Sequence, residues 1–174
     1  CLLMKTLEQT CEPDIALRNL VDIIKALQSQ GRDFHQVITD DAGLVRLVTV
    51  LGVSDGMGKL MRFRPELVMA AASDSCESHL YNHAQRRAHV LEAVGADPAD
   101  NRMPKATKPL AEAATALRQT YRKQLAAIMA QDATADDPIE IQPRISQELS
   151  DLADAALEGA LAIARNEVDG SEHV

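Results

Sequence analysis

The chain has 174 residues, of which 46% are hydrophobic and only 2% are aromatic, and it carries a formal net charge of −8 at neutral pH. This length suits one domain or an extended helical array and is too short for two ordinary domains. The negative charge disfavours nucleic acid, and no uncharged apolar run approaches the roughly 18 residues that span a membrane, so we expect neither as a partner.

The apolar residues are mainly leucine and alanine, which favour helices, whereas strand-rich cores draw on aromatic and β-branched residues. We therefore predict an all-α fold: a helical array with a long antiparallel helix pair at its carboxy-terminal end. Three widely spaced cysteines, Cys1, Cys11 and Cys76, do not suggest a disulfide framework and suit a reducing compartment. The cytoplasm is the expected location.

The amino-terminal part contains a predicted amphipathic helix over residues 14–28. Its apolar side chains recur every three or four positions, Pro13 precedes it, and Gly31 closes it. A short element is expected over residues 34–38. Asp40 and Asp41 are then predicted to cap the next helix.

The stretch over residues 44–67, LVRLVTVLGVSDGMGKLMRFRPEL, predicts three helices joined by tight corners. Gly52 is expected to end the first helix in a left-handed conformation. Ser54 or Asp55 is expected to cap the second helix, and Pro65 is expected to open the third.

The glycines of this stretch also suggest a phosphate-binding loop, which we set aside. Five residues rather than four separate Gly52 from Gly58, and Leu60 follows Lys59 where the motif needs a serine or threonine to hold magnesium. No buried parallel strand precedes the loop, although the motif requires one.

A further helix is predicted over residues 76–94, with Gly95 at its end. Cys76, His79 and His83 fall on one face of this helix, which suggests a metal site. At a rise of about 1.5 Å per residue, however, the three side chains spread over about 10 Å, too far to converge on one ion. We therefore assign no metal site here.

Residues 96–109 contain three prolines and cannot continue a helix, so a proline-rich connector is predicted there. The connector separates an amino-terminal helical subdomain, residues 1–95, from a long helical hairpin, residues 110–174.

The hairpin is predicted to consist of helices over residues 110–131 and 146–168, with an acidic loop over residues 132–143 between them. Ser146 is the expected cap of the second helix. The helices are expected to pack antiparallel through a seam formed by Leu117, Tyr121, Leu125, Leu149, Leu152 and Ala156. The wider apolar face predicted for the second helix adds Ala153, Leu157, Ala160, Leu161 and Ala164.

Arg118 and Arg122 are four residues apart on the first hairpin helix, so they share one side of it, beside the seam and turned outward. We hypothesise that this basic pair supports a phosphate-bearing site in a neighbouring domain. A solvated basic face is the alternative interpretation.

The sequence shows no pattern of carboxylates that predicts a magnesium site for a transfer reaction. The sequence contains no Asp-x-Asp, and the pairs Asp40-Asp41 and Asp136-Asp137 fall at a helix start and in a loop. No catalytic, cofactor-binding or metal-binding residue is predicted.

Two sequence elements resemble one known family. Residues 44–67 are similar to the pattern LGxSxxLxxxLxRxPE, and residues 117–168 are similar to LRxxYRRxLLxIAARDL followed by ELxDLADAALExALAxAR. Both patterns are typical of the glutamine synthetase adenylyltransferases, also called glutamate-ammonia-ligase adenylyltransferases. The similarity runs from residue 13 to residue 168 and is closest to the amino-terminal half of the actinobacterial enzymes.

The resemblance implies a helical segment from the adenylyl-removing half of a large enzyme. That enzyme adds AMP to glutamine synthetase and removes it by phosphorolysis, which regulates nitrogen assimilation. The implied partners are glutamine synthetase, the enzyme's own nucleotidyltransferase domain and nitrogen-signal proteins. Mg²⁺ and ATP or phosphate are implied for the parent enzyme, and no cofactor is implied for this segment.

In the family, a catalytic pattern, Gly-Lys-x-Gly-Gly followed by Ser-Asp-x-Asp, comes after the helix that corresponds to residues 146–168. The present sequence does not contain it, so the segment alone is expected to be inactive. Gln131 also stands where the family pattern has arginine. The alternative is a free-standing helical interaction module without enzymatic activity, and a reading frame that continues into the catalytic pattern would distinguish the two.

Overall fold

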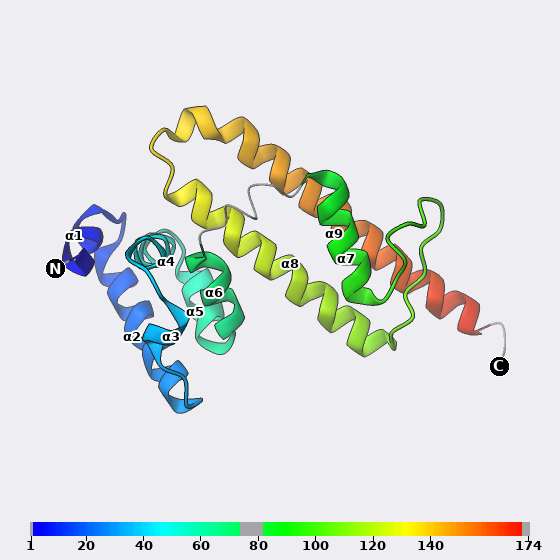
Figure 1. The fold of residues 1–174 in the computed structure, drawn as a ribbon, viewed down its shortest axis with the longest axis horizontal. Helices are drawn as coiled ribbons and strands as arrows, with labels where there is room; N and C mark the ends of the chain where they lie inside the picture. The colour runs from blue at the N-terminus through cyan, green and yellow to red at the C-terminus, as the bar shows by residue number, and fades with distance from the viewer. Residues whose placement is uncertain (1, 74–81, 172–174) are drawn as a thin grey trace. The chain divides into compact units, whose positions relative to one another are not determined.

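A computed structural model describes residues 2–73 and 82–171, and helix is the only regular secondary structure in these two ranges (Figure 1). The predicted all-α fold is confirmed. The chain forms two compact units, residues 1–77 with 126–142 (unit one) and residues 78–125 with 143–174 (unit two). The predicted division into residues 1–95, 96–109 and 110–174 stays a prediction.

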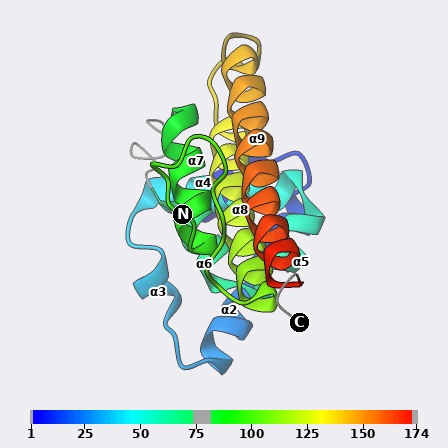
Figure 2. The same cartoon turned by 90° about the vertical axis from the view of Figure 1, so that its right-hand side faces the viewer.

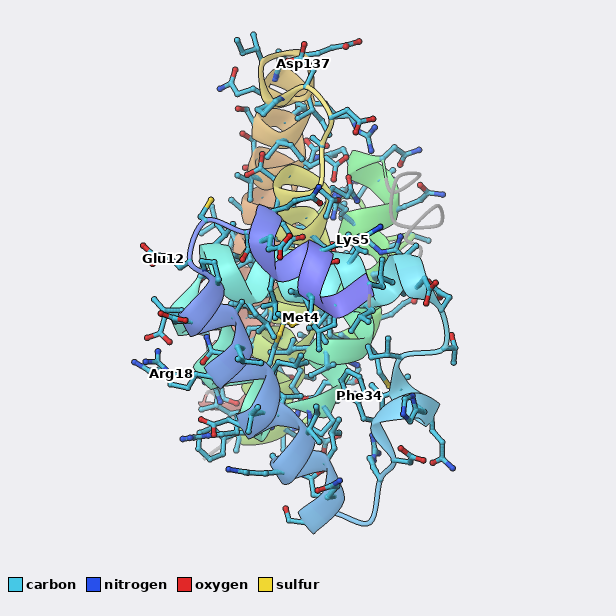
Figure 3. The ribbon with its side chains drawn as sticks, turned by 90° about the vertical axis from the view of Figure 1, so that its left-hand side faces the viewer. Met4, Lys5, Glu12, Arg18, Phe34 and Asp137 are labelled. Carbon is cyan, nitrogen blue, oxygen red and sulfur yellow. The ribbon has the colours of Figure 1, made fainter. Side chains whose placement is uncertain are left out.

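Helices α1 to α6 form the amino-terminal part of unit one, with α4 at their centre. The helices are α1 (Leu2–Gln9), α2 (Pro13–Ser29), α3 (Phe34–Val37), α4 (Asp41–Val53), α5 (Asp55–Phe63) and α6 (Pro65–Ala72). Helix α4 packs against α1, α2, α5 and α6, and its side chains Leu47, Val48 and Leu51 are fully buried. Figure 3 views this unit from its α1 and α2 side, where Arg18 lies on the exposed face of α2.

The helix starts of unit one follow the local signals in the sequence. Pro13 and Pro65 occupy the first turns of α2 and α6. The Asp40 carboxylate accepts a hydrogen bond of 2.6 Å from the Gly43 amide, and the Ser54 hydroxyl accepts one of 3.2 Å from the Met57 amide. Because a capping side chain satisfies an amide that has no partner within the helix, these predicted starts are confirmed.

The prediction for Gly52 is wrong. Gly52 lies inside α4, and the positive-φ glycines of the described residues are Gly31 and Gly95. A Cβ added at Gly52 would lie 2.8 Å from the Cβ of Thr10, which is buried at the end of α1. Gly52 is therefore required because α1 and α4 approach closely, a reason that local sequence does not reveal.

We expect Gly52→Ala to lower the free energy of unfolding by about 1–3 kcal/mol, because the added methyl group must push the buried Thr10 away. Gly56→Ala is the matched control. Gly56 is exposed in α5, and an added Cβ meets only the Ser54 hydroxyl at 4.0 Å, so alanine should be neutral or stabilising there. Urea unfolding of both variants tests this, and equal stabilities would contradict it.

Unit two contains α7 (His83–Val94), most of α8 (Leu110–Ala133) and most of α9 (Pro138–Ser171). Its hydrophobic core consists of Leu91, Val94, Ala96, Ala106, Ala113, Ala162 and Ile163, with Leu117 packed against it. A Cβ added at Gly159 of α9 would lie 3.0 Å from a methyl group of Leu117 of α8. Small side chains thus let these helices approach closely, as helix packing requires.

The predicted antiparallel pairing of α8 and α9 is seen within unit two. Near the start of α8, Ala113 shares the core with Ala162, and further along α8, Leu117 meets Gly159. Residue numbers thus fall along α9 as they rise along α8. Figure 1 shows the two helices joined as a hairpin.

The predicted acidic loop over residues 132–143 is wrong. Helix α8 continues to Ala133, and α9 already begins at Pro138, with Pro143 inside it. The Asp137 carboxylate accepts hydrogen bonds from the amides of Ile139 at 2.9 Å and Glu140 at 3.1 Å. Since a proline fits the first position of a helix after such a cap, Pro138 starts the helix instead of breaking it.

The predicted apolar face of α9 is also largely wrong. Ser146 lies inside the helix rather than at its cap, and Leu149, Leu157 and Leu161 are 41%, 64% and 52% exposed. The buried positions of α9 in unit two are Ile145, Glu148, Leu152, Ala155, Gly159, Ala162 and Ile163. Leu152 alone of the predicted face is fully buried. The sequence offers two apolar stripes, and the structure buries the one that includes a charged residue.

Residues 76–81 of the helix predicted over residues 76–94 lie outside the described residues, and its described part is α7. It starts at His83, where the Asn82 side chain accepts from the Gln85 amide and the Gln85 side chain accepts from the Asn82 amide. This reciprocal capping box fixes the start of the helix. As predicted, Gly95 ends the helix, and the structure shows it in the left-handed conformation.

Candidate functional site

The most distinctive site in unit two is a buried polar cluster around Arg86 of α7, called here the Arg86 cluster. Its members are Arg86, Gln124, Arg144 and Glu148. The Arg86 guanidinium donates to the Gln124 side-chain oxygen at 3.0 Å and to the Glu148 carboxylate at 2.9 Å. The other carboxylate oxygen of Glu148 accepts from Arg144 at 3.0 Å. One buried guanidinium therefore joins α7, α8 and α9.

This cluster holds the helices in position rather than transferring protons. The Arg86 side chain is only 1% exposed, and a guanidinium stays charged at any physiological pH. A buried charge is tolerated only when partners compensate for its lost hydration, and Glu148 supplies the opposite charge. We infer that the Arg86 cluster fixes the register of the three helices.

The neighbouring Arg87 ties the proline-rich connector to unit two. Its guanidinium makes two bonds of 2.7 Å to the Glu158 carboxylate and donates to the carbonyls of Pro98 and Asp100, also at 2.7 Å. Within the connector, amides of the following residues donate to the Asp100 carboxylate, and these bonds lower the pKa of Asp100.

The connector also buries apolar surface. Ala96 and Ala106 belong to the core of unit two, and the Ala106 amide donates to the Ala162 carbonyl at 3.0 Å. The connector is therefore packed against the helices of unit two without being helical itself.

Arg118 and Arg122, the predicted phosphate-side pair, lie on α8 away from the core of unit two. Arg118 is exposed, and its guanidinium donates to the Thr115 hydroxyl at 3.3 Å on the same helix. Arg122 is partly exposed. Both are on α8, the helix that carries Gln124 of the Arg86 cluster, and the Arg86–Gln124 hydrogen bond holds this helix against α7. The phosphate-side role itself stays a prediction.

The cysteine and histidine face proposed from sequence falls mainly outside the described residues, which is where Cys76 and His79 lie. His83, the described member, lies 3.4 Å from the Asp151 carboxylate across α7 and α9. Residues 2–73 and 82–171 contain no group of three or more histidine, cysteine, aspartate or glutamate side chains that could hold a metal ion.

The aspartate pairs have structural roles that do not fit a magnesium site. Asp40 and Asp137 each cap a helix through a side-chain oxygen. Because Mg²⁺ requires carboxylate oxygens that converge on it, caps at the ends of separate helices do not supply such a site. Neither aspartate pair thus supplies converging ligands for the ion that the resemblance implies for the parent enzyme.

The glycine-rich stretch of residues 52–59 forms a helix corner, with α4 before Ser54 and α5 after it. Lys59 pairs with Asp55 at 2.7 Å, and Arg18 reaches the same carboxylate at 2.9 Å. The hydrogen bond from Lys59 is the largest cause of a lowered pKa at Asp55. Lys59 is therefore engaged on its own helix, and the interpretation as a helix corner is supported.

Analysis of the sequence missed the buried residues Arg86, Gln124 and Glu148. A signal for them was present, because Glu148 and Glu158 are the two glutamates of the element ELxDLADAALE, and they pair with the adjacent arginines Arg86 and Arg87.

Among the described residues, no helix is both long enough and apolar enough to cross a membrane. No protein-family model matches the chain, and no solved structure matches it.

Curated proteins do match. The chain is 69% identical over 172 residues to the bifunctional glutamine synthetase adenylyltransferase/adenylyl-removing enzyme of Bifidobacterium longum strain DJO10A, and this alignment covers 99% of the chain and 16% of the relative. The enzyme of the same name from Cutibacterium acnes is 33% identical over 91% of the chain, and that from Corynebacterium glutamicum is 30% identical over 94%. These alignments cover 16% and 18% of the two relatives.

The chain therefore spans about a sixth of the length of the relatives that it matches. The resemblance predicted from the two sequence elements is confirmed, because the chain is similar over nearly its whole length to one segment of the bifunctional glutamine synthetase adenylyltransferase/adenylyl-removing enzymes.

Proposed function

We propose that the chain is a helical segment of a bifunctional enzyme that adenylylates and de-adenylylates glutamine synthetase and thereby regulates nitrogen assimilation. The observation that carries this proposal is the 69% identity over 99% of the chain to the Bifidobacterium longum enzyme of that name. The parent protein is a cytoplasmic nucleotidyltransferase. We assign the segment to its adenylyl-removing half because of the resemblance of residues 44–67 and 117–168.

Within that parent, the segment acts as a scaffold and supplies no reacting group. Phosphoryl and adenylyl transfer needs metal ions and positioned groups around the phosphate oxygens. Several carboxylates of this chain instead cap a helix or pair with an arginine, as Asp40 and Glu148 do. Mg²⁺ and ATP or phosphate are therefore held by the rest of the enzyme. The partners are glutamine synthetase, the nucleotidyltransferase domain and nitrogen-signal proteins.

The surface of α8 that carries Arg118 and Arg122 faces the nucleotidyltransferase domain in this proposal. Guanidinium groups recognise phosphate oxygens through paired hydrogen bonds and gain specificity when the element that carries them is rigid. The Arg86 cluster supplies that rigidity, because Gln124 ties the same helix to α7. The basic pair can thus support a phosphate-bearing site without taking part in bond breaking.

We expect the double variant Arg118→Glu and Arg122→Glu to lower de-adenylylation by the full-length parent enzyme on the order of tenfold, because two charges near the phosphates are reversed. Lys123→Glu is the control, since Lys123 is exposed on another side of α8 and should leave the rate nearly unchanged. Full activity of the double variant would contradict the proposed role and show that Arg118 and Arg122 belong to a solvated basic face.

The alternative is that the chain is a free-standing helical interaction module. Its reading frame distinguishes the two candidates. Continuation into Gly-Lys-x-Gly-Gly and Ser-Asp-x-Asp supports the enzyme segment, and a stop codon directly after the segment supports the module.

A further inference from the structure

The proline-rich connector forms a closed loop on unit two, because its two ends lie together. Ala96 and Ala106 both belong to the hydrophobic core of this unit. The Thr107 hydroxyl donates to the Gly95 carbonyl at 2.7 Å, and the Ala106 amide donates to the Ala162 carbonyl of α9 at 3.0 Å. Figure 2 shows the connector as the green trace that runs without helix from the end of α7 to the start of α8. The chain thus leaves the core and returns to it within the connector.

Residues 97–106 of the connector, called here the strap, bury little apolar surface. Most of these residues are exposed, and Met103 is 60% exposed. The buried members of the strap are Pro104 and Ala106. Because hydrophobic stabilisation is roughly proportional to the apolar area removed from water, burial alone holds the strap only weakly.

One side chain of α7 holds the middle of the strap. The Arg87 guanidinium donates to the carbonyls of Pro98 and Asp100, each at 2.7 Å, while its other bonds join Glu158 of α9. The Arg87 side chain is only 14% exposed. Hydrogen bonds from a charged donor are stronger than those between neutral groups, and the planar guanidinium carries enough donors to bind all three partners at once. Arg87 is therefore the main polar attachment of the strap.

The helices of unit two do not need the strap to pack against one another. Leu91 of α7, Ala113 of α8 and Ala162 of α9 share the hydrophobic core directly. Near its far end the strap is attached by a 3.1 Å hydrogen bond from Arg165 to the Pro104 carbonyl. Segments with few buried apolar contacts open at a lower free energy than the core helices around them.

We propose that the strap opens as a cooperative unit of its own while the helices of unit two stay folded, and that Arg87 is the latch that keeps it closed. Opening breaks the bonds from Arg87 to the two strap carbonyls and withdraws Ala106 from the core. The guanidinium keeps its bonds to Glu158, so opening leaves neither charge without its partner. This device lies within the segment itself and does not depend on the activity of the parent enzyme.

Native-state hydrogen exchange, read by NMR in the 174-residue chain at low urea concentrations, tests whether the strap is a separate unit. The Ala106 amide reports on the strap, and the amides of Leu91 and Ile163 report on the helices. We expect Ala106 to be protected at least about tenfold less than the helix amides and to respond less to urea, because opening the strap exposes less surface than unfolding the unit. Equal protection and equal urea dependence at the three amides would overturn the proposal.

Three variants test the latch. Arg87→Met should lower the protection of the Ala106 amide by at least about tenfold, because the closed strap loses two charge-assisted hydrogen bonds. Arg87→Lys keeps the charge beside Glu158 but cannot bind three partners at once, so it should give a smaller loss. Arg102→Met, on the exposed part of the strap, is the control and should give none.

Circular dichroism checks that each variant is folded. Unchanged protection of Ala106 in a folded Arg87→Met variant would overturn the assignment of Arg87 as the latch. If Arg87→Met does not fold, the milder Arg87→Lys decides in its place, and unchanged protection of Ala106 in that variant would overturn the assignment.

Discussion

Ala162→Asp should destabilise unit two by on the order of 4 kcal/mol, because it places an unpaired carboxylate in an apolar core. Ala162 is 0% exposed, shares the core with Leu91 and Ala113, and accepts the amide of Ala106 through its carbonyl. The new side chain would displace close-packed neighbours and find no cation among the core residues. The measurement is the midpoint of urea unfolding followed by circular dichroism.

Ala160→Asp is the matched control for this prediction. Ala160 lies two residues away on the same helix and is exposed, so an aspartate there keeps its hydration. Surface substitutions of this kind usually change stability by less than about 0.5 kcal/mol. Unfolding of the two variants at the same urea concentration would contradict the observed burial of Ala162 and exposure of Ala160 on α9.

Arg86→Met should lower the free energy of unfolding by about 3–5 kcal/mol, because the buried Glu148 loses its closest cation. The methionine fills part of the space but cannot donate to Glu148 or to Gln124, which are bonded at 2.9 and 3.0 Å. Arg144 remains near Glu148 on the more exposed side and compensates only in part. Chemical unfolding of the variant measures the loss.

A second substitution makes this prediction specific. Adding Glu148→Leu to Arg86→Met should restore much of the lost stability, since removing both charges removes the penalty of an unpaired one. Arg102→Met on the exposed part of the connector should have little effect. A loss below about 1 kcal/mol for Arg86→Met would show that the cluster does not hold the three helices together.

The features predicted correctly from sequence depend on residues only a few positions apart. Asp40, Ser54 and Pro65 start helices through contacts within three residues, and Gly95 ends one through its own backbone conformation. Such signals act in any tertiary context, which is why the helix corners in residues 44–67 could be placed.

The features that were predicted wrongly from the sequence depend mainly on residues far away in the chain. Position 52 must be glycine because Thr10, 42 positions earlier in the chain, lies against it. Glu148 is buried because Arg86, 62 positions away, neutralises its charge. Hydrophobicity alone assigns a glutamate to the surface, so the prediction selected the stripe with Leu157 instead. Pro138 is ambiguous for a related reason, since a proline can break a helix or begin one, and the Asp137 cap decides between these.

The candidate site was predictable only in part. Arg118 was expected to face outward, and the structure places it on the exposed surface of α8. The Arg86 cluster was not predictable from periodicity, because its buried side chains are polar and come from three helices. Its glutamate, Glu148, nevertheless stands within the family element that carried the resemblance.

The most direct test of the account is the release of AMP from adenylylated glutamine synthetase in the presence of magnesium and phosphate. We compare the full-length parent, the parent lacking residues 1–174, and the 174-residue chain alone. We expect release by the full-length parent, a large loss on deletion of the segment, and none from the chain, because no group of three or more possible metal ligands was found in the part of the chain that the structure describes. AMP release by the pure chain, or an undiminished rate after the deletion, would contradict it.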